Sequence, residues 1–272
     1  MNIQAATKPT RSETEDAFWD ARWAGGHMIH VNEREKLEGI LTMIPETLGT
    51  LLDVGCGTGW MLEALRPRCD YMVGLDSSLQ GLGRASGTGD AVAGSGIHLP
   101  FRDGTFDLVL CAEVLEHYRD DVLDEAAAEL ARVSKRSVLV TVPFEENLVM
   151  NTVRCDNCST EFHSSLHMRS FSAQDLVRLF EPHGLTAAAV RKTGNRPYRS
   201  EWIVRMNAAL TGYRAFWRRG LRCPRCGNTE FRCRRARENP VSLVLEGMNR
   251  ILSRLLPSQP HNLCVLLEKD QG

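Results

Sequence analysis

The segment LLDVGCGTGWMLEAL, residues 51–65, restricts the possible folds of the chain more than any other feature. An apolar run ends at Asp53, and a turn containing Gly55, Gly57 and Gly59 leads into a helical pattern. Glycine lets the backbone turn tightly and approach a ligand closely, while the amides of the following helix face the same space. The segment therefore predicts a strand–turn–helix unit of an α/β sheet, with a ligand at the carboxyl end of the strand.

A second apolar run, YMVGLD, residues 71–76, ends in Asp76. Its carboxylate follows the glycine turn by about 20 residues, the spacing at which an acid binds a ribose. The glycines are spaced GxGxG, not GxGxxG as in dinucleotide sites, and the lysine of a P-loop does not follow. This combination favours a single nucleoside over NAD or ATP as the ligand.

Four motifs occur in a fixed order within residues 48–145: LDVGCGTGW, VGLDSS, LPFRDGTFDLVLCAEVLEHY and SVLVTVPF. In this order they resemble the motifs of the class I S-adenosylmethionine-dependent methyltransferases. The resemblance implies an α/β fold with a Rossmann-like, doubly wound sheet of seven mostly parallel strands, the last one antiparallel. It also implies S-adenosylmethionine as cofactor and S-adenosylhomocysteine as product.

The same resemblance implies roles for individual residues. The Gly55–Gly59 turn would hold the methionine part of the cofactor, and Asp76 would hold the ribose hydroxyls. Relatives usually place an aspartate shortly before the LPF element to bind the adenine amino group, but Ser95 stands there, and Asp90 comes too early. The predicted cofactor-binding residues are Asp53, Gly55, Cys56, Gly57, Gly59, Asp76, Ser77, Ser95, Gly96, Ile97, Cys111 and Glu113.

The run FDLVLCAEVLEH, residues 106–117, is apolar enough for a buried strand of a parallel sheet. Glu113, Glu116 and His117 follow at its carboxyl end, on the edge where the cofactor is expected. His117 is a candidate general base near the transferred methyl group. A role in capping the turn or shaping the pocket fits its position equally well.

Two CxxC pairs in the second half, Cys155 with Cys158 and Cys223 with Cys226, predict a metal site. The chain has nine cysteines and starts without the features of a signal peptide, so we expect reduced thiols and a cytoplasmic location. Four thiolates fill a tetrahedral zinc site and leave no position for water or substrate. We therefore predict a structural zinc, although the fold must bring together two pairs about 65 residues apart.

The two cysteine pairs interrupt different connections of the predicted sheet. Ser172 begins a helix that ends before Gly184, and the last two strands are expected at 185–192 and 262–269. We therefore place zinc-binding insertions at about 151–170 and 198–238. Both belong to a methyltransferase domain spanning 48–272.

A helical lid and a helical segment near the end complete the predicted organisation. Residues 1–47 predict a helical lid over the cofactor, in which Trp19, Arg22 and His27 are candidate substrate-binding residues. A simple core stripe of tryptophans is the alternative for Trp19. Residues 240–257 predict an amphipathic helix for core or dimer contact.

The loop after the fifth strand carries His163, His167 and Arg169. The zinc would hold this loop over the methyl donor, so His163 or His167 is favoured over His117 as the catalytic base, and Arg169 as a substrate contact. Hydrogen bonding within the metal element, or a solvated loop, is the alternative reading.

Three classes of function remain open. The leading one is a methyltransferase acting on an oxygen, nitrogen or activated carbon of a small molecule, in secondary metabolism such as natural product biosynthesis or in cell-envelope metabolism. Nine arginines between Arg214 and Arg237 keep an RNA or protein methyltransferase as the alternative, whereas the net charge of −1 opposes it. A cofactor-binding scaffold without activity is the third class. We expect a monomer or homodimer, and the sequence has no run that could span a membrane.

Overall fold

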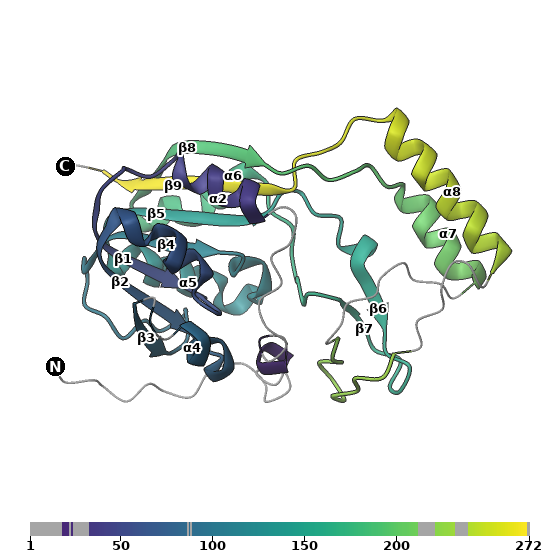
Figure 1. The fold of residues 1–272 in the computed structure, drawn as a ribbon, viewed down its shortest axis with the longest axis horizontal. Coiled ribbons are helices and arrows are strands. Elements are labelled where there is room, and N and C mark those ends of the chain that lie inside the picture. Colours follow the sequence, from purple (N-terminus) through teal and green to yellow (C-terminus); the bar gives the residue numbers. More distant parts are fainter. Residues whose placement is uncertain are drawn as a thin grey trace.

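Seven strands form one twisted sheet in the order β3-β2-β1-β4-β5-β9-β8 in the computed structural model (Figure 1). The structure describes residues 18–21, 23, 33–85, 87, 89–211, 221–231 and 239–270. The strands are β1 Leu48–Val54, β2 Cys69–Asp76, β3 Asp90–Ala93, β4 Phe106–Ala112, β5 Ser134–Pro143, β8 Leu185–Thr193 and β9 Asn262–Lys269. Neighbours from β3 to β5 are parallel, whereas β9 is antiparallel to both β5 and β8. The predicted fold class, with its antiparallel last strand, is confirmed.

Helices cover both faces of the sheet, because successive residues of a strand point to opposite sides. On one face, Leu52 and Val109 pack in a core with α5 (Asp120–Val133) and α6 (Ala173–Phe180). On the other, Leu51 and Leu108 pack in a second core. The helices of that second layer are α2 Glu33–Leu41, α3 Trp60–Leu65 and α4 Leu79–Ala85. Four short 3₁₀ turns lie at Arg66–Arg68, Leu115–His117, Leu148–Asn151 and Glu181–His183.

The predicted start and end of α6 are confirmed in detail. The Ser172 hydroxyl accepts from the Asp175 amide, and the Asp175 carboxylate accepts from the Ser172 amide, which is a complete capping box. At the other end, Gly184 adopts a left-handed conformation with φ of 75°. These local signals were sufficient to place the helix.

Two insertions extend from the carboxyl side of the sheet. The first, after β5, contains a hairpin of β6 (Thr152–Arg154) and β7 (Glu161–His163). The second, between β8 and β9, contains α7 (Glu201–Thr211) and α8 (Pro240–Leu255), with the Cys223 and Cys226 pair between them in the chain. Figure 1 shows the two helices side by side, beyond the end of the sheet and above the hairpin.

Helix α8 confirms the predicted helix at 240–257, but α7 lies within the range assigned to the second zinc-binding insertion and was not predicted. The two helices bury polar groups between them: the Ser242 hydroxyl donates to the Asn207 side chain at 2.7 Å. The opposite face of α8 exposes Val241, Val244, Met248, Ile251 and Leu255. None of the helices in the described residues is long and apolar enough to cross a membrane.

Candidate functional site

The glycine turn lies at the carboxyl edge of the sheet, between β1 and α3. Gly55, Gly57 and Gly59 all have left-handed φ values, of 78°, 52° and 76°. A Cβ at Gly55 would come within 2.3 Å of a Val114 methyl group, so a side chain is excluded there by conformation and by space. Glycine is therefore required at position 55, and the backbone there lines a pocket.

Asp76, the last residue of β2, fixes this turn. One of its carboxylate oxygens accepts from the Gly57 amide and the other from the Ser78 amide, each at 2.8 Å. The Ser78 hydroxyl in turn donates to Asp20 at 2.5 Å, which ties the N-terminal helical segment to the site. Beneath the turn, burial raises the pKa of Asp53 to about 7, with a further contribution from Asp76.

A pocket opens over the turn and the neighbouring strand ends, as expected at the edge of a parallel sheet. Its lining residues are Trp19, Trp23, Val54, Gly55, Leu75, Asp76, Ser77, Gly94, Ser95, Gly96, Glu113, Val114, His117 and Tyr118. Predicted cofactor residues from three separate motifs thus meet in one cavity. Cys56, Ile97 and Cys111 are instead buried in the cores on either side of the sheet.

Ser95 and Asp90, the nearest acidic residue, lie in different places relative to the pocket. Ser95 lines the pocket, whereas Asp90 begins β3 at its opposite end and accepts a hydrogen bond from the Tyr71 hydroxyl. Asp90 is therefore unable to replace the missing adenine-binding aspartate. The contact of Ser95 with the adenine stays a prediction.

Two tryptophans from the N-terminal segment form one wall of the pocket. The Trp23 ring lies against the glycine turn, because a Cβ at Gly57 would come within 2.7 Å of it. Trp19 packs edge-to-face on His117, with ring centroids 4.7 Å apart. Arg22 and His27 lie outside the described residues. The later part of the predicted lid, helix α2, contacts β8 and β9, and its Lys36 lies 3.4 Å from Glu113 of the pocket lining.

The three candidate histidines are brought together although they come from two parts of the chain. His117 ends the 3₁₀ turn after β4, and His163 ends β7. His167 packs on both, with ring centroids 4.9 Å from His117 and 4.5 Å from His163. The Met168 amide donates to the Glu116 carbonyl at 2.8 Å and joins the two segments. Of the three histidines, His117 lines the pocket over the glycine turn.

Two buried glutamates complete what we call the histidine–glutamate cluster, comprising Glu116, His117, Glu146, His163 and His167. Glu146 accepts from His167 Nδ1, and its other oxygen lies 3.5 Å from His163 Nε2. Burial raises the pKa of Glu146, but hydrogen bonds from the two histidines outweigh it and leave that pKa well below the usual range. Burial raises the pKa of Glu116 well above the usual range of a glutamate, and the nearby Glu113 carboxylate raises it further.

Sequence reasoning did not assign a role to either glutamate. Glu116 precedes His117 in the strand-four motif and could have been included on that ground. Glu146 has no comparable signal, because it reaches the histidines only when the hairpin folds back.

Glu113 and Arg169 make contacts that the sequence did not suggest. Glu113 lines the pocket and lies 3.4 Å from the Lys36 ammonium of α2. Arg169 donates to the Tyr118 carbonyl and forms an ion pair of 2.8 Å with Asp120, and it is not a pocket-lining residue.

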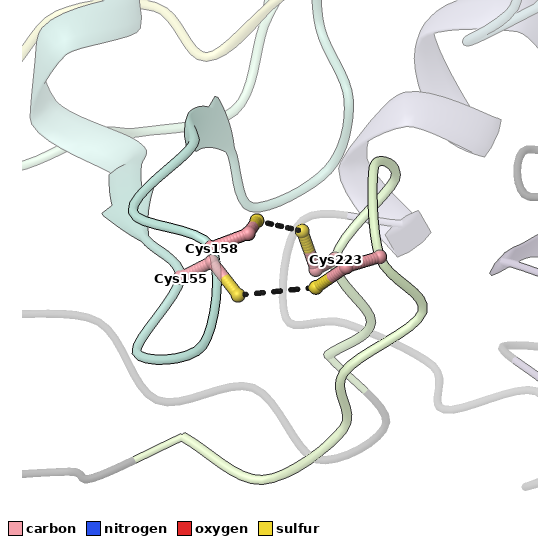
Figure 2. Close-up of side chains that lie close together, drawn as sticks. Cys155, Cys158 and Cys223 are labelled. Atoms are coloured by element: carbon pink, nitrogen blue, oxygen red, sulfur yellow. Dashed lines mark hydrogen bonds between the residues drawn. The ribbon is translucent and has the colours of Figure 1, made fainter.

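The four cysteines of the two CxxC pairs meet in one cluster, as predicted. Figure 2 shows Cys155 and Cys158 on one loop and Cys223 on the loop that faces it. The sulfurs of Cys155 and Cys226, and those of Cys158 and Cys223, are each 3.6 Å apart. Disulfide sulfurs would be about 2.05 Å apart, whereas Zn–S bonds of about 2.3 Å place the corners of a tetrahedron about 3.8 Å apart. The donor set and its spacing therefore fit a four-thiolate zinc site.

The two cysteine loops repeat one backbone pattern. Each first cysteine donates its amide to the carbonyl five residues later, from Cys155 to Thr160 and from Cys223 to Asn228. The residue four positions after each, Ser159 or Gly227, has a left-handed φ. Hydrogen bonding with the Thr160 side chain and backbone lowers the pKa of Cys158 to about 6, whereas burial raises the pKa of Cys223 to about 12. Two matched turns thus present the sulfurs to a common centre.

A small apolar core connects the cysteine cluster to the pocket. Cys155 and Cys223 pack in it with Phe18, Phe162 and Leu166, and Trp19 packs against it. Trp19 also lines the pocket, and Leu166 lies between His163 and His167 in the chain. The cysteine cluster is therefore placed to fix the histidine loop and the tryptophan wall.

The sequence comparisons agree with this geometry. Residues 52–142 match the family model of the methyltransferase domain. The demethylmenaquinone methyltransferase of Thermobifida fusca is 40% identical over 93 residues, 31% of this chain and 39% of the relative. The tRNA (carboxymethyluridine(34)-5-O)-methyltransferase of Schizosaccharomyces pombe is 31% identical over 86 residues, 31% of this chain and 36% of the relative. The matches cover 32–64% of the length of five curated relatives, and about half or less in four of them.

The structural comparison extends over nearly the whole chain. One similar structure is a complex between the Haloferax volcanii Trm112 methyltransferase activator and a methyltransferase. The match covers 96% of this chain and 99% of the other, with a TM-score of 0.55 and 19% identity. At this identity the likeness concerns the fold, including the presence of elements beyond the central sheet.

Proposed function

We propose that the protein transfers a methyl group from S-adenosylmethionine. The proposal is supported by the match of residues 52–142 to the methyltransferase domain model and by the order of the seven-stranded sheet. The single observation that carries the proposal is the pocket over the glycine turn, where the Gly55 backbone, the Asp76 carboxylate and Ser95 face one space. In this assignment the turn holds the methionine part. Asp76, whose carboxylate can accept further hydrogen bonds, holds the ribose hydroxyls.

The tryptophan wall supports a cationic donor. Trp19 and Trp23 present aromatic rings to the pocket, and a sulfonium ion is attracted to the face of an aromatic ring. The donor is already activated for attack, so the protein has to align the acceptor and, where the acceptor carries a proton, help to remove it. The histidine–glutamate cluster borders the same pocket and is the proposed acceptor side.

We infer a small-molecule acceptor, with oxygen, nitrogen or activated carbon as the methylated atom. The tryptophans and Tyr118 line the pocket, and such aromatic walls suit a compact, partly apolar acceptor. An RNA or protein acceptor is the second candidate, favoured by the likeness to the tRNA methyltransferase and by the arginines near Cys223. Of that arginine cluster, Arg222 and Arg225 lie within the described residues. An activator subunit, as in the Haloferax complex, is a further candidate partner.

We also propose that Cys155, Cys158, Cys223 and Cys226 hold a structural zinc. Four thiolates leave no coordination position for a substrate, so the ion would act by fixing the two loops. The reduced thiols that such a site requires fit the expected cytoplasmic location.

Calorimetry with S-adenosylhomocysteine tests the cofactor assignment. We expect Gly57→Arg to abolish binding, because a side chain there blocks the backbone approach, and Asp76→Ala to weaken it strongly. Asp90→Ala is the matched control, because this acid lies at the far end of its strand and should leave the affinity unchanged. Equal affinity of all three variants and the wild type would remove the basis for the proposal.

The acceptor class is tested by screening small phenols, amines and tRNA for release of S-adenosylhomocysteine. A small-molecule acceptor predicts turnover that changes little with salt. Affinity that falls steeply as salt rises, with tRNA as the productive acceptor, would establish the second candidate instead.

A further inference from the structure

We propose that Glu116, His117 and His167 bind a divalent transition-metal ion beside the cofactor pocket, at a site separate from the four cysteines. One ligand atom from each of these residues lies within 4.8 Å of the others. Binding of the ion is independent of the proposed methyltransferase function. Only its effect on turnover rests on that function.

The first argument is the direction of the two imidazole rings. Nδ1 of His167 hydrogen-bonds to Glu146, and Nδ1 of His117 lies 3.3 Å from the Leu166 carbonyl oxygen. Both partners are acceptors, so each Nδ1 carries the proton and each Nε2 presents a lone pair. Metal-binding histidines are usually oriented in this way, through a carboxylate or a backbone carbonyl at the other ring nitrogen.

The second argument is the carboxylate that these two nitrogens face. Glu116 Oε1 lies 3.9 Å from His117 Nε2 and 4.0 Å from His167 Nε2. Glu116 is 1% exposed, and neither of its carboxylate oxygens has a hydrogen-bond partner among the residues that the structure describes. A buried carboxyl group without partners is costly, and a cation shared with two imidazoles would satisfy it.

The spacing is close to that of a ligand set. Metal–ligand bonds of about 2.1 Å place neighbouring ligand atoms about 3.0–3.4 Å apart, for right-angled or tetrahedral geometry. The two separations from Glu116 are therefore about 0.5–1 Å longer than in a bound site, and all three ligand atoms lie within 4.8 Å of one another. Side-chain rotations would have to bring the three groups together.

His163 and Glu146 form a competing set with His167, but their contacts give them another role. Nδ1 of His163 accepts from the Ser165 amide at 3.3 Å and from the His167 amide at 3.2 Å. Its proton must then lie on Nε2, which faces Glu146 and has no lone pair for a metal. Glu146 is thus held between two histidines, and it positions His167 for the ion instead of binding it.

The donor set indicates the class of metal. Two imidazoles and a carboxylate suit Zn²⁺, Fe²⁺, Co²⁺ or Mn²⁺ better than Mg²⁺ or Ca²⁺. Three protein ligands leave positions for water or for an oxygen of the acceptor. Because His117 lines the cofactor pocket, such an oxygen would be held on the side from which the methyl group is attacked. The ligand class would be an acceptor with a hydroxyl, phenol or carboxylate oxygen.

Cobalt titration of the full-length protein tests the site. Treatment with EDTA empties an open three-ligand site while leaving a four-thiolate zinc in place, and zinc analysis of the same sample verifies this. We expect Co²⁺ to bind one equivalent with ligand-field absorption and no thiolate charge-transfer band. Glu116→Gln and His167→Ala should lose this equivalent, and His183→Ala, a histidine paired with Asp124 outside the cluster, should retain it.

Glu116→Gln is nearly isosteric, and its folding is checked by the melting temperature and by S-adenosylhomocysteine binding. Absence of a cobalt equivalent in the wild type, or its retention in Glu116→Gln, overturns the metal site. Cobalt binding without cofactor binding would instead refute the proposed function and leave the metal site standing. The two failures are therefore distinguishable.

Discussion

The cysteine cluster and the histidine–glutamate cluster are built from neighbouring segments but offer opposite chemistry. Cys155 and Cys158 lie on the loop of the β6–β7 hairpin, and His163 ends the same hairpin. The first cluster gathers four soft sulfurs, which would fill all four coordination positions of a zinc ion and leave none for a substrate. The second gathers imidazoles and carboxylates and includes His117, a residue of the pocket. One inserted hairpin thus contributes residues to both clusters.

The connection between the two clusters is direct. Thr152 of β6 pairs with His163 of β7, so closing the cysteine end of the hairpin sets the backbone of the histidine end. The small core around Leu166 adds a second link. Loss of the proposed zinc should therefore disturb both clusters, whereas loss of the histidines should leave the four-cysteine zinc site intact. This asymmetry is what the following experiments test.

The largest effect is expected from Cys226→Ser. Removing one thiolate opens the zinc site, so we expect loss of zinc and a melting temperature lower by about 10 °C or more. Zinc analysis and calorimetry measure both, with Cys69→Ser as control, because Cys69 is a half-buried cysteine outside the cluster. A Cys226→Ser protein with full stability and no zinc would show that the hairpin folds without help from a metal ion.

The next effect is expected from His117→Ala and His167→Ala. Each should lower turnover by about 100-fold or more, because each removes a group that borders the acceptor side. Zinc content and affinity for S-adenosylhomocysteine should remain at wild-type values. Turnover of both variants near the wild-type rate would show that the protein works by alignment alone.

Glu146→Gln should have a smaller effect, because it acts through His167. The amide can still contact the imidazole but holds no charge, and changes of this kind usually cost about 10–100-fold in metal affinity. Cobalt affinity is the readout, since a purely structural role would move the melting temperature instead. An unchanged affinity together with a lower melting temperature would contradict the positioning role.

The smallest effect is expected from Ser95→Ala. Losing one neutral hydrogen bond to the cofactor should cost about 0.5–1.5 kcal/mol in binding, or up to roughly tenfold in affinity. Neither metal site should respond, which calorimetry and metal analysis can show on one sample. A fall in affinity of several hundredfold would contradict this, because it is more than the loss of one neutral hydrogen bond can explain.

Where the sequence predicted the fold well, the signals were local. The glycine turn, the capping box at Ser172 and the apolar runs of the central strands each depend on residues close in the chain. Helix α7 was missed because its apolar residues are divided between two faces: Ile203 and Val204 are buried together with Asn207, whereas Trp202 and Leu210 are exposed.

The candidate site was only partly predictable. The three histidines and the four cysteines were recognised by type and spacing. Glu146 is 21 residues from His167, and no periodicity links them until the hairpin folds back. The pairing of Glu116 with two imidazoles is likewise a tertiary contact. A sequence can present such donors, but their convergence on one point is a property of the fold.

Anomalous diffraction from crystals of the full chain soaked in Co²⁺ would test the two-cluster account most directly. Data on each side of the zinc and cobalt edges separate the two metals. We predict a zinc peak equidistant from the sulfurs of Cys155, Cys158, Cys223 and Cys226, and a cobalt peak between Glu116, His117 and His167. Cobalt confined to the cysteine cluster, or a histidine–glutamate cluster without a peak, would contradict it.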